Sequence, residues 1–270
     1  MVNNKAIDAS KVSEFISQWL LEYATNANIK GFVVGISGGI DSAVVSTLCA
    51  KTGLETLCVQ MPIHQSQMEL RRASGQIAFL KKNFAKVEEV KIDLTSTFDG
   101  FSNLFDSAQS PTEALTLANT RARLRMTTLY HLAGINGLLV AGTGNKIEDF
   151  GVGFFTKYGD GGVDISPIAD LLKSQVFALA AHLGIPNSIQ QASPTDGLFG
   201  DARTDEDQLG ATYDELEWAM SFDENNSNEI DFSERQREVL KIYRRLNKLN
   251  QHKIQPIPVC KIPSEFFNIT

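Results

Sequence analysis

Short apolar runs and longer segments with helical periodicity alternate along the first half of the chain. The apolar runs predict strands at residues 32–36, 56–59, 87–92 and 138–141. The periodic segments predict helices at residues 8–24, from 41 onward, 66–84 and 110–134. Strands that alternate with helices form parallel sheets with right-handed crossovers. The pattern therefore predicts an α/β fold, a doubly wound open parallel sheet with helices on both faces.

The remaining segments are more polar. Residues 93–110 carry isolated phenylalanines and predict a partly ordered excursion, which ends at a strong helix start, Ser110-Pro111-Thr112-Glu113. Beyond the fourth strand, we expect helices at 169–183, 213–220 and 232–249, and an extended end at 251–256. The acidic stretches predict a lid or a disordered loop at 192–211 and a linker at 223–230.

The most informative stretch, Gly35-Ile36-Ser37-Gly38-Gly39-Ile40-Asp41-Ser42, follows the first predicted strand. Its glycines allow a sharp turn before a helix N-terminus, so backbone N–H groups can form a cradle for phosphate. Asp41 at the rim can hold the magnesium ion that accompanies a nucleotide's phosphates. The stretch has neither the Walker nor the dinucleotide pattern. It resembles the Ser-Gly-Gly-x-Asp-Ser pyrophosphate loop of the N-type ATP pyrophosphatases, which favours this interpretation over a tight turn that serves packing alone.

A second candidate region follows the fourth predicted strand. Ligands of open α/β sheets bind at the carboxyl ends of the strands, so we expect the loops after the first and fourth strands to face one site. Glu148 can then supply a second carboxylate for metal, although a lone glutamate there is more often a solvated cap. Residues 151–162 hold five glycines around Phe154 and Phe155, which favours a pocket for a planar ligand over a mobile loop.

Three arginines lie near the centre of the helix predicted at 110–134. At about 100° per residue, Arg123 falls on one flank of its apolar stripe, and Arg121 and Arg125 fall on the other. The three arginines therefore have different roles, and a solvated basic flank is the expectation for most of them.

The bulk composition is that of a soluble globular protein, with 43% hydrophobic and 21% charged residues in 270. No apolar run approaches the roughly 18 residues of a membrane span, and the N-terminus lacks the apolar core of a signal peptide. The three cysteines form no CxxC pair, which favours a reducing compartment over a zinc site. The net charge of −7 argues against a nucleic-acid surface. We therefore expect a cytoplasmic protein that binds neither membrane nor nucleic acid.

The motifs together resemble the ammonia-dependent NAD synthetases over essentially the whole chain. The most specific match is Gly-Phe-Phe-Thr-Lys-Tyr-Gly-Asp-Gly-Gly-Val-Asp at residues 153–164. Supporting matches lie at 121–126, 142–148, 193–198 and His252-Lys253. The resemblance implies an adenine nucleotide alpha hydrolase-like fold in a single domain at 1–270. It also implies a ligase that amidates deamido-NAD with ammonia through an adenylate, using ATP and Mg²⁺ and releasing AMP and pyrophosphate.

The resemblance also implies which residues form the site. The ATP-binding residues would be Gly35, Ile36, Ser37, Gly38, Gly39, Ile40, Asp41, Ser42, Thr143, Lys173 and Thr195. The metal ligands would be Asp41 and Glu148. The deamido-NAD contacts would be Arg123, Lys157, Asp164, His252 and Lys253, with Phe154 or Phe155 stacking on the pyridine. The catalytic residues would be Asp160, which orients ammonia and accepts its proton, and Lys173, which stabilises charge on the adenylate.

Three features depart from the family pattern. Gln60 stands where an arginine is common, so the adenine pocket is expected to be built differently. The stretch between Glu148 and the Phe-Phe-Thr-Lys run is one residue longer than in some members. Asp196-Gly197 replaces a more usual Ala-Asp after Pro-Thr, which alters the expected contacts of the acidic stretch.

We expect no glutaminase domain, because the segment before the leading helix is short, so free ammonia or a separate donor must serve. In the family, the deamido-NAD site lies at a homodimer interface, which implies a homodimer that meets along the helix from Pro111.

Two classes of alternative remain open. Another N-type pyrophosphatase of the GMP-synthetase type would lack the run at 153–164, and a tRNA-thiolating enzyme would need catalytic cysteines and a basic RNA-binding face. A non-catalytic adenine-nucleotide sensor would have no need to retain Asp41, Glu148 and Lys173 together.

Overall fold

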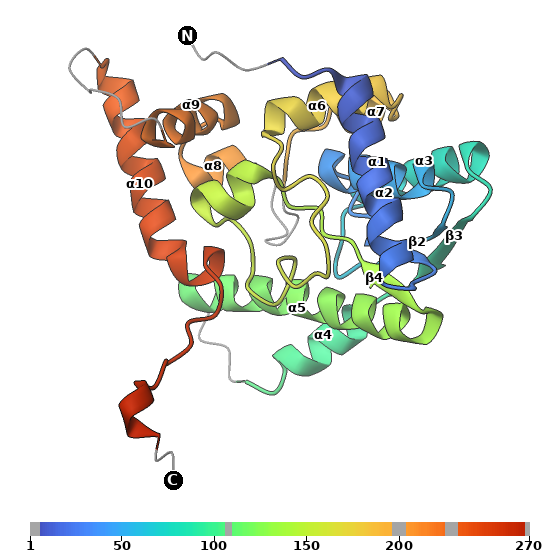
Figure 1. The fold of residues 1–270 in the computed structure, drawn as a ribbon, viewed down its shortest axis with the longest axis horizontal. Helices are drawn as coiled ribbons and strands as arrows, with labels where there is room; N and C mark the ends of the chain where they lie inside the picture. The colour runs from blue at the N-terminus through green and yellow to red at the C-terminus, as the bar shows by residue number, and fades with distance from the viewer. Residues whose placement is uncertain (1–5, 106–109, 196–203, 225–231, 268–270) are drawn as a thin grey trace.

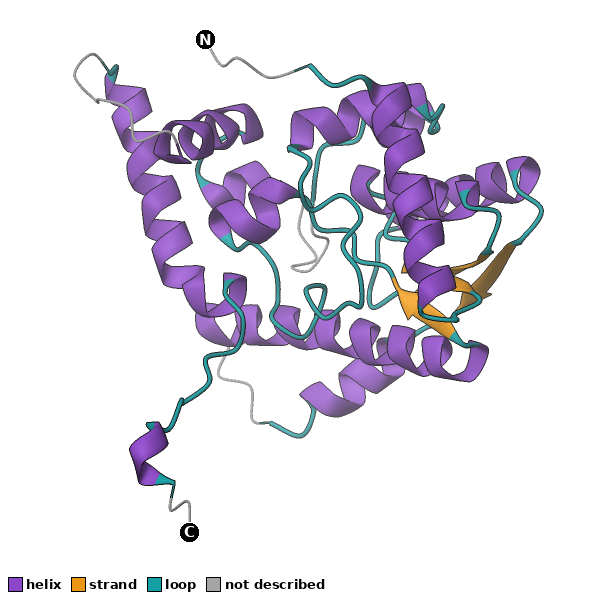
Figure 2. Cartoon of the chain, viewed as in Figure 1, coloured by secondary structure: helices purple, strands orange, loops and turns teal. Residues whose placement is uncertain are grey.

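Four parallel strands form the centre of the fold (Figures 1 and 2). The computed structural model describes residues 6–105, 110–195, 204–224 and 232–267. The strands are β1 (Gly31–Gly35), β2 (Glu55–Gln60), β3 (Val87–Lys91) and β4 (Leu138–Val140), in the order β3-β2-β1-β4. Gly31 lies opposite Glu55 of β2 and Leu138 of β4. The predicted parallel sheet is confirmed.

Helices cover both faces of this sheet. One face packs against α1 (Ala9–Asn26), α2 (Ile40–Lys51), α3 (Gln67–Asn83), α6 (Lys173–His182) and α7 (Asn187–Gln190). The other face packs against α4 (Thr95–Ser102) and α5 (Pro111–Asn136). Phe32 and Val34 of β1 enter the first core and Val33 enters the second. Because successive strand residues point to opposite faces, a strand buried on both sides is apolar throughout.

A third core forms beside the sheet rather than on it (Figure 1). It joins a π-helix, η1 (Ile147–Val152), to α8 (Asp205–Leu209), α9 (Tyr213–Glu224) and α10 (Glu234–Ile254). Leu216 and Val239 are among its buried side chains, and Trp218, Phe222 and Phe232 pack their rings together at its edge. Since η1 follows β4, this core ties the last helices to the carboxyl edge of the sheet.

The turn between β1 and α2 requires a glycine. Gly38 has a φ of +88°, and a Cβ atom there would lie 2.6 Å from the carbonyl oxygen of Glu69. The side chain of Arg72 donates to the carbonyl of Gly38 over 3.1 Å. The first residues of α3 therefore fix the shape of the turn, and only glycine fits there.

The predicted helix starts are confirmed where the sequence supplies caps. The hydroxyl of Ser110 accepts from the backbone N–H of Glu113, and Pro111 is the first residue of α5. Ser66 and Glu69 form a reciprocal capping box before α3. Such caps satisfy N–H groups that have no partner inside the helix.

The structure corrects three expectations. Residues 95–102 form α4 within the stretch at 93–110, because Phe98 is buried in the second core. The helix expected from 169 begins at Lys173, where the Gln175 side chain accepts from the N–H of Leu172. Residues 205–209 form α8 inside the acidic stretch, whereas residues 196–203 and most of the linker at 223–230 lie outside the described residues.

The extended end expected at 251–256 is also wrong, because α10 continues to Ile254. The side chains of Asn247 and Asn250 donate to the carbonyls of Gly151 and Val152, each over 2.7 Å. Contacts with η1 thus stabilise the last turns of α10. These contacts are long-range, so the local sequence pattern did not predict the helix there.

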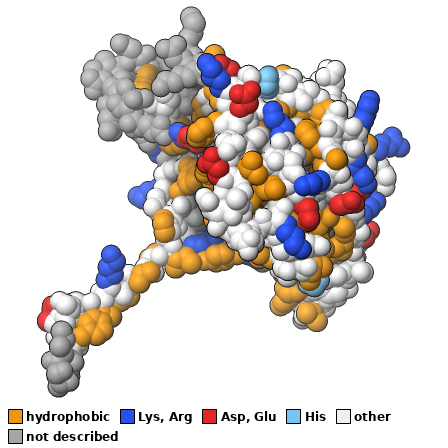
Figure 3. Space-filling view, turned by 45° about the vertical axis from the view of Figure 1, so that its right-hand side comes forward, with side chains coloured by type: hydrophobic (Ala, Val, Ile, Leu, Met, Phe, Trp, Pro, Cys, Tyr) orange, Lys and Arg blue, Asp and Glu red, His pale blue; other side chains and the backbone are white. Residues whose placement is uncertain are grey.

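Beyond α10 the chain leaves the body of the molecule (Figures 1 and 3). This C-terminal segment, residues 255–267, contains a short 3₁₀ turn, η2 (Ser264–Phe266). Its large apolar side chains are exposed: Ile257, Val259, Ile262, Phe266 and Phe267. Among the described helices, none is both long and apolar enough to cross a membrane.

We predict that Phe98→Ala destabilises the protein by about 3–5 kcal/mol, because Phe98 is 4% exposed and its removal leaves a cavity in the second core. Urea unfolding followed by circular dichroism measures the change. Phe101→Ala on the same helix is the control, since Phe101 is 39% exposed. Equal losses in the two variants would contradict the docking of α4.

Candidate active site

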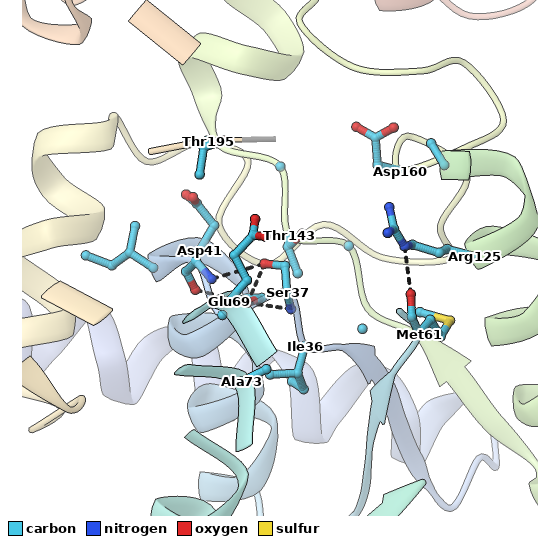
Figure 4. A pocket seen from close by; sticks show the side chains of 18 of the residues that line it. Ile36, Ser37, Asp41, Met61, Glu69, Ala73, Arg125, Thr143, Asp160 and Thr195 are labelled. Carbon is cyan, nitrogen blue, oxygen red and sulfur yellow. Dashed lines mark hydrogen bonds between the residues drawn. The ribbon is translucent and has the colours of Figure 1, made fainter. Parts of the chain in front are cut away.

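A pocket opens at the carboxyl ends of β1, β2 and β4 (Figure 4). Its walls come from the β1–α2 turn, Met61 and Pro62 after β2, residues 141–144 after β4, and the side chain of Arg125 on α5. This is the edge where open parallel sheets bind ligands. The structure brings all the expected ATP and metal residues to this pocket, at 35–42, Thr143, Glu148, Lys173 and Thr195. Their individual roles remain predictions.

Hydrogen bonds within the β1–α2 turn hold its backbone in one shape. The hydroxyl of Ser42 accepts from the N–H of Ser37 and donates to the carbonyl of Gly39 over 3.0 Å. The hydroxyl of Ser37 accepts from the N–H of Gly39 over 3.1 Å. The turn leads directly into the N-terminus of α2, so the pocket floor carries the positive end of a helix dipole. An anion such as a phosphate suits that position.

A buried charge cluster lies beside the turn. The ammonium of Lys173 lies 2.7 Å from Asp41 Oδ2 and 2.9 Å from Glu148 Oε1. The Lys173 side chain is 3% exposed, and the two carboxylates are 17% and 16% exposed. Asp41 follows β1, Glu148 lies on η1 after β4, and Lys173 opens α6. Three segments far apart in the sequence therefore meet at one cation.

Lys173 and Glu148 stabilise each other's charge, whereas burial and the negative charge of Glu148 raise the pKa of Asp41 above its ordinary value. Burial disfavours the charged form of Lys173, but Asp41 and Glu148 outweigh it and raise the pKa of the ammonium. Burial also opposes ionisation of Glu148, but Lys173 and a hydrogen bond from Tyr213 leave the pKa of Glu148 below its ordinary value. Lys173 and Glu148 therefore stay charged at neutral pH.

Two further residues hold this cluster, and sequence reasoning did not find them. Asn145 is fully buried; its amide donates to Asp41 Oδ1 over 3.1 Å, and its carbonyl accepts from the N–H of Glu148. The hydroxyl of Tyr213 donates to Glu148 Oε1 over 2.6 Å. Asn145 lies in the stretch at 142–148 and could have been noticed there, whereas Tyr213 carries no local signal.

The stretch after Glu148, which we expect to be one residue longer than in some members of the family, forms the π-helix η1. A π-helix bonds i→i+5 instead of i→i+4, so it absorbs one residue while the chain continues in the same direction. Gly153 ends η1 with a φ of +65°. The N–H of Phe154 then donates to the carbonyl of Glu148 over 2.8 Å, and Phe154 lines the pocket.

Asp160 and Arg125 lie on the side of the pocket away from Asp41 and Thr195 (Figure 4). The carboxylate of Asp160 accepts from the N–H of Thr156 over 3.0 Å. Its side chain is exposed because the pocket is open, yet the protein atoms crowded around it raise its pKa. Asp160 is thus a carboxylate available to a ligand in the pocket.

Asp149 is another pocket carboxylate that sequence reasoning missed. A Cβ atom on Gly144 would lie 2.1 Å from its Oδ2, so this carboxylate packs directly on the loop after β4. Burial raises the pKa of Asp149 to about 8, and the charges of Glu148, Asp160 and Asp41 add to the shift. Asp149 is therefore largely protonated in the native protein at neutral pH.

The residues expected to contact deamido-NAD lie outside the pocket, and most of them gather beside α10. Arg123 donates to the carbonyl of Lys157 over 3.3 Å, and the ammonium of Lys157 donates to the carbonyl of His252. Lys253 donates to the carbonyl of Phe155 over 2.7 Å and lies 5.1 Å from the centre of its ring.

Asp164 does not join that group. Its carboxylate accepts from the N–H of Val140 over 2.8 Å and from the hydroxyl of Tyr130 over 3.0 Å, so it supports the end of β4. Of the five expected contacts, four therefore lie together, and Asp164 lies apart from them at the end of β4.

The expectation of a solvated basic flank on α5 is wrong for two arginines. Arg125 donates to the carbonyl of Met61 over 3.1 Å and to the side chain of Gln65 over 2.8 Å (Figure 4). The guanidinium of Arg121 stacks 4.4 Å from the ring centre of Phe98. Both side chains are held by segments that pack against α5: Arg121 by α4, and Arg125 by the loop that follows β2.

Gln60 is one of the expected departures from the family pattern, and the structure describes it. Another departure, Asp196-Gly197, lies outside the described residues. Gln60 lines the pocket, and its amide donates to Ser74 over 3.2 Å and to Glu89 over 3.3 Å. The Gln60 side chain is therefore held by α3 and β3.

We predict that Asp149→Asn stabilises the nucleotide-free protein more at pH 8 than at pH 5. Between the unfolded pKa of 3.8 and the folded value of about 8, the native Asp149 keeps a proton that the unfolded chain has lost. Stability therefore falls as pH rises through this window, and asparagine removes that loss. Melting temperatures at the two pH values measure it, with Asp170→Asn as the control because the Asp170 side chain is 98% exposed. A pH-independent difference would reject the shifted pKa.

Comparison with known proteins assigns the family. The family model described as NAD synthase matches residues 12–257. The NH(3)-dependent NAD(+) synthetases of Mesoplasma florum and Carboxydothermus hydrogenoformans are 39% and 37% identical to this chain over 216 and 243 residues. These alignments cover 80% and 89% of this chain and 86% and 93% of the two relatives.

Solved structures of other proteins share this fold over nearly the whole chain. The NMN synthetase from Francisella tularensis superposes with a TM-score of 0.80 at 30% identity, covering 96% of this chain and 99% of that one. The NH3-dependent NAD synthetase from Campylobacter jejuni, in complex with the nitrate ion, gives 0.76 at 26% identity, covering 94% and 100%. From its sequence, its fold and the pocket at the carboxyl edge of its sheet, the chain belongs to the NAD synthase family and catalyses the ammonia-dependent formation of NAD.

Proposed function

We propose that this chain forms NAD in two chemical steps within the pocket between the β1–α2 turn and Asp160. A carboxylate oxygen of deamido-NAD bonds to the α-phosphorus of ATP, and pyrophosphate leaves. The nitrogen of ammonia then bonds to the activated carbonyl carbon, the bond to AMP breaks, and nitrogen gives up its surplus proton. The observation that carries this proposal is the contact of Lys173 with both Asp41 and Glu148, beside the β1–α2 turn at the N-terminus of α2.

Magnesium fits the carboxylates of this cluster. Asp41 and Glu148 converge on one cation, and Mg²⁺ is commonly held by one or two carboxylates together with nucleotide phosphates. Among the described residues no group of three Asp, Glu, His or Cys is arranged around a metal, so the nucleotide would complete the coordination. When bound, the ion would neutralise charge on the triphosphate. Asp41 and Glu148 would hold it, and Lys173 would share the two carboxylates with it.

The remaining residues would have different roles according to their positions in the pocket. The residues of the β1–α2 turn, with Thr143 and Thr195, line the space where the triphosphate would lie. Lys173 supplies a fixed positive charge for the phosphate oxygens. Asp160, across the pocket, would bind ammonium through its carboxylate and take the proton that the attacking nitrogen releases.

The nicotinate nucleotide would enter from the side of α10. Arg123, Lys157, His252 and Lys253 lie together there, and the phenylalanine pair 154–155 joins that cluster to the pocket. This basic cluster suits a dianionic dinucleotide whose nicotinate ring must reach the α-phosphorus of ATP.

We also propose that residues 1–270 act as one synthetase unit that uses free ammonia, as the NH(3)-dependent relatives are named to do. A second candidate substrate is nicotinate mononucleotide, because the Francisella tularensis neighbour is an NMN synthetase. The mononucleotide carries the same carboxylate and lacks only the adenylyl half. Both substrates would therefore present the same reacting group to Asp160 and Lys173.

We predict that the protein forms NAD, AMP and pyrophosphate in equal amounts from deamido-NAD, ATP, Mg²⁺ and ammonium. Parallel reactions replace ammonium with glutamine, and deamido-NAD with nicotinate mononucleotide; product chromatography distinguishes them. Asp160→Asn should slow amide formation about 100-fold or more while the adenylate still forms, because the proton acceptor is lost. Loss of the adenylate step alone would remove Asp160 from the ammonia site, and faster turnover of the mononucleotide would make it the preferred substrate.

We further propose a homodimer. The helix α5 exposes Leu115, Tyr130 and Ile135. The C-terminal segment 255–267 carries five exposed large apolar side chains away from the body (Figure 3). Exposed apolar surface of this extent is typical of an interface.

We predict a solution mass near twice 29.7 kDa by light scattering. Changing Ile257 and Val259 together to Ser should shift the mass toward the monomer, because both side chains are more than 60% exposed in the single chain. The same double change at the exposed Phe15 and Met68, on α1 and α3, is the control. A monomeric parent protein would reject the homodimer.

A further inference from the structure

Tyr213, the first residue of α9, contacts two members of the charge cluster at once. Its hydroxyl donates to Glu148 Oε1 over 2.6 Å. The ammonium of Lys173 lies 4.7 Å from the centre of its ring. The residue is 6% exposed, so a hydrogen bond to an ionised carboxylate and a cation–π contact both act here with little water to weaken them.

The hydroxyl of Tyr213 is fixed as a donor. A second carboxylate, Asp205, lies 3.2 Å from it through Oδ2. A tyrosine phenol keeps its proton at neutral pH, so the hydroxyl can donate to either carboxylate. With one proton and two acceptors, the shorter bond goes to Glu148 Oε1, the same oxygen that Lys173 contacts. Holding Oε1 from two sides restricts rotation of the Glu148 carboxylate.

The same helix also holds the segment that carries Lys173. The carboxylate of Glu217, one turn after Tyr213, accepts from the N–H of Ser174 over 2.8 Å and from its hydroxyl over 2.7 Å. Glu217 is 1% exposed. A carboxylate at the N-terminus of α6 satisfies an unpaired N–H and favours the helix dipole. Through Tyr213 and Glu217, α9 therefore sets the positions of both Glu148 and Lys173.

We propose that Tyr213 is a positioning residue that orients Glu148 for the magnesium–nucleotide complex and keeps Lys173 beside it. This inference rests on the proposed function, in which Glu148 is a metal ligand. Residues that support a metal ligand in this way commonly change metal affinity or activity by about 10- to 100-fold when they are replaced. The effect of Tyr213 should therefore be seen in metal binding, separately from the binding of deamido-NAD.

The test uses Tyr213→Phe, which removes the hydroxyl and keeps the ring beneath Lys173. Binding of Mn²⁺, used as a paramagnetic substitute for Mg²⁺, is measured by electron paramagnetic resonance with a non-hydrolysable ATP analogue present. We expect Mn²⁺ binding about 10-fold weaker than in the parent protein, a matching rise in the Mg²⁺ needed for turnover, and an unchanged KM for deamido-NAD. Tyr243→Phe is the control, because Tyr243 is 5% exposed in the same core and lies outside the pocket lining.

A second comparison separates this inference from the proposed function. Glu148→Gln should weaken Mn²⁺ binding, and adding Tyr213→Phe to it should cause no further loss, because Tyr213 acts through Glu148. Normal Mn²⁺ binding in Tyr213→Phe, with a loss in Glu148→Gln, would overturn the role of Tyr213 and leave the proposed function standing. Normal binding in Glu148→Gln would overturn the metal assignment and, with it, this inference. Melting temperatures with the analogue bound verify that each variant is folded.

Discussion

The structure depends on one buried cation. Lys173 is almost fully enclosed and is stabilised because Asp41 and Glu148 lie within 2.9 Å of it. Removing one partner from such a buried group typically costs about 3–5 kcal/mol, because the remaining charge has no water to solvate it. The pairing thus forces the β1–α2 turn, the π-helix η1 and the start of α6 into one arrangement, and the pocket is built around that arrangement.

The sheet explains why these segments can meet. β1 and β4 are neighbours and parallel, so the turns that follow them emerge side by side, one with Asp41 and the other with Glu148. The helix α6 packs on α1 and α2 and returns its first residue, Lys173, to the same edge. The third core then encloses the cluster from the other side, where Tyr213 donates to Glu148 and Glu217 accepts from Ser174, the neighbour of Lys173. Each layer of the fold contributes one wall or one charge to the site.

The two ends of the pocket carry different groups and would serve different chemical steps. In the proposed function, the triphosphate lies at the end of the pocket with the charge cluster and the β1–α2 turn, and Asp160 lies at the other end. Such a separation suits a ligase that activates a carboxylate before amidating it, because pyrophosphate leaves the α-phosphorus, whereas ammonia attacks the carbonyl carbon. Membership in the NAD synthase family agrees with this plan.

Local signals in the sequence were enough to predict the parallel sheet, the tight turn at 35–42, the capped start of α5 at Ser110, and the family. Each of these has a signal within a short stretch of sequence: apolar periodicity, glycines that permit one backbone conformation, or a contiguous motif. Long-range contacts, rather than local signals, make Arg125 donate to Met61, extend α10 to Ile254, and bring the hydroxyl of Tyr213 to Glu148. These contacts join residues 64 to 98 positions apart, and the energy that decides them comes from packing and from pairing of buried charges, neither of which a local pattern records.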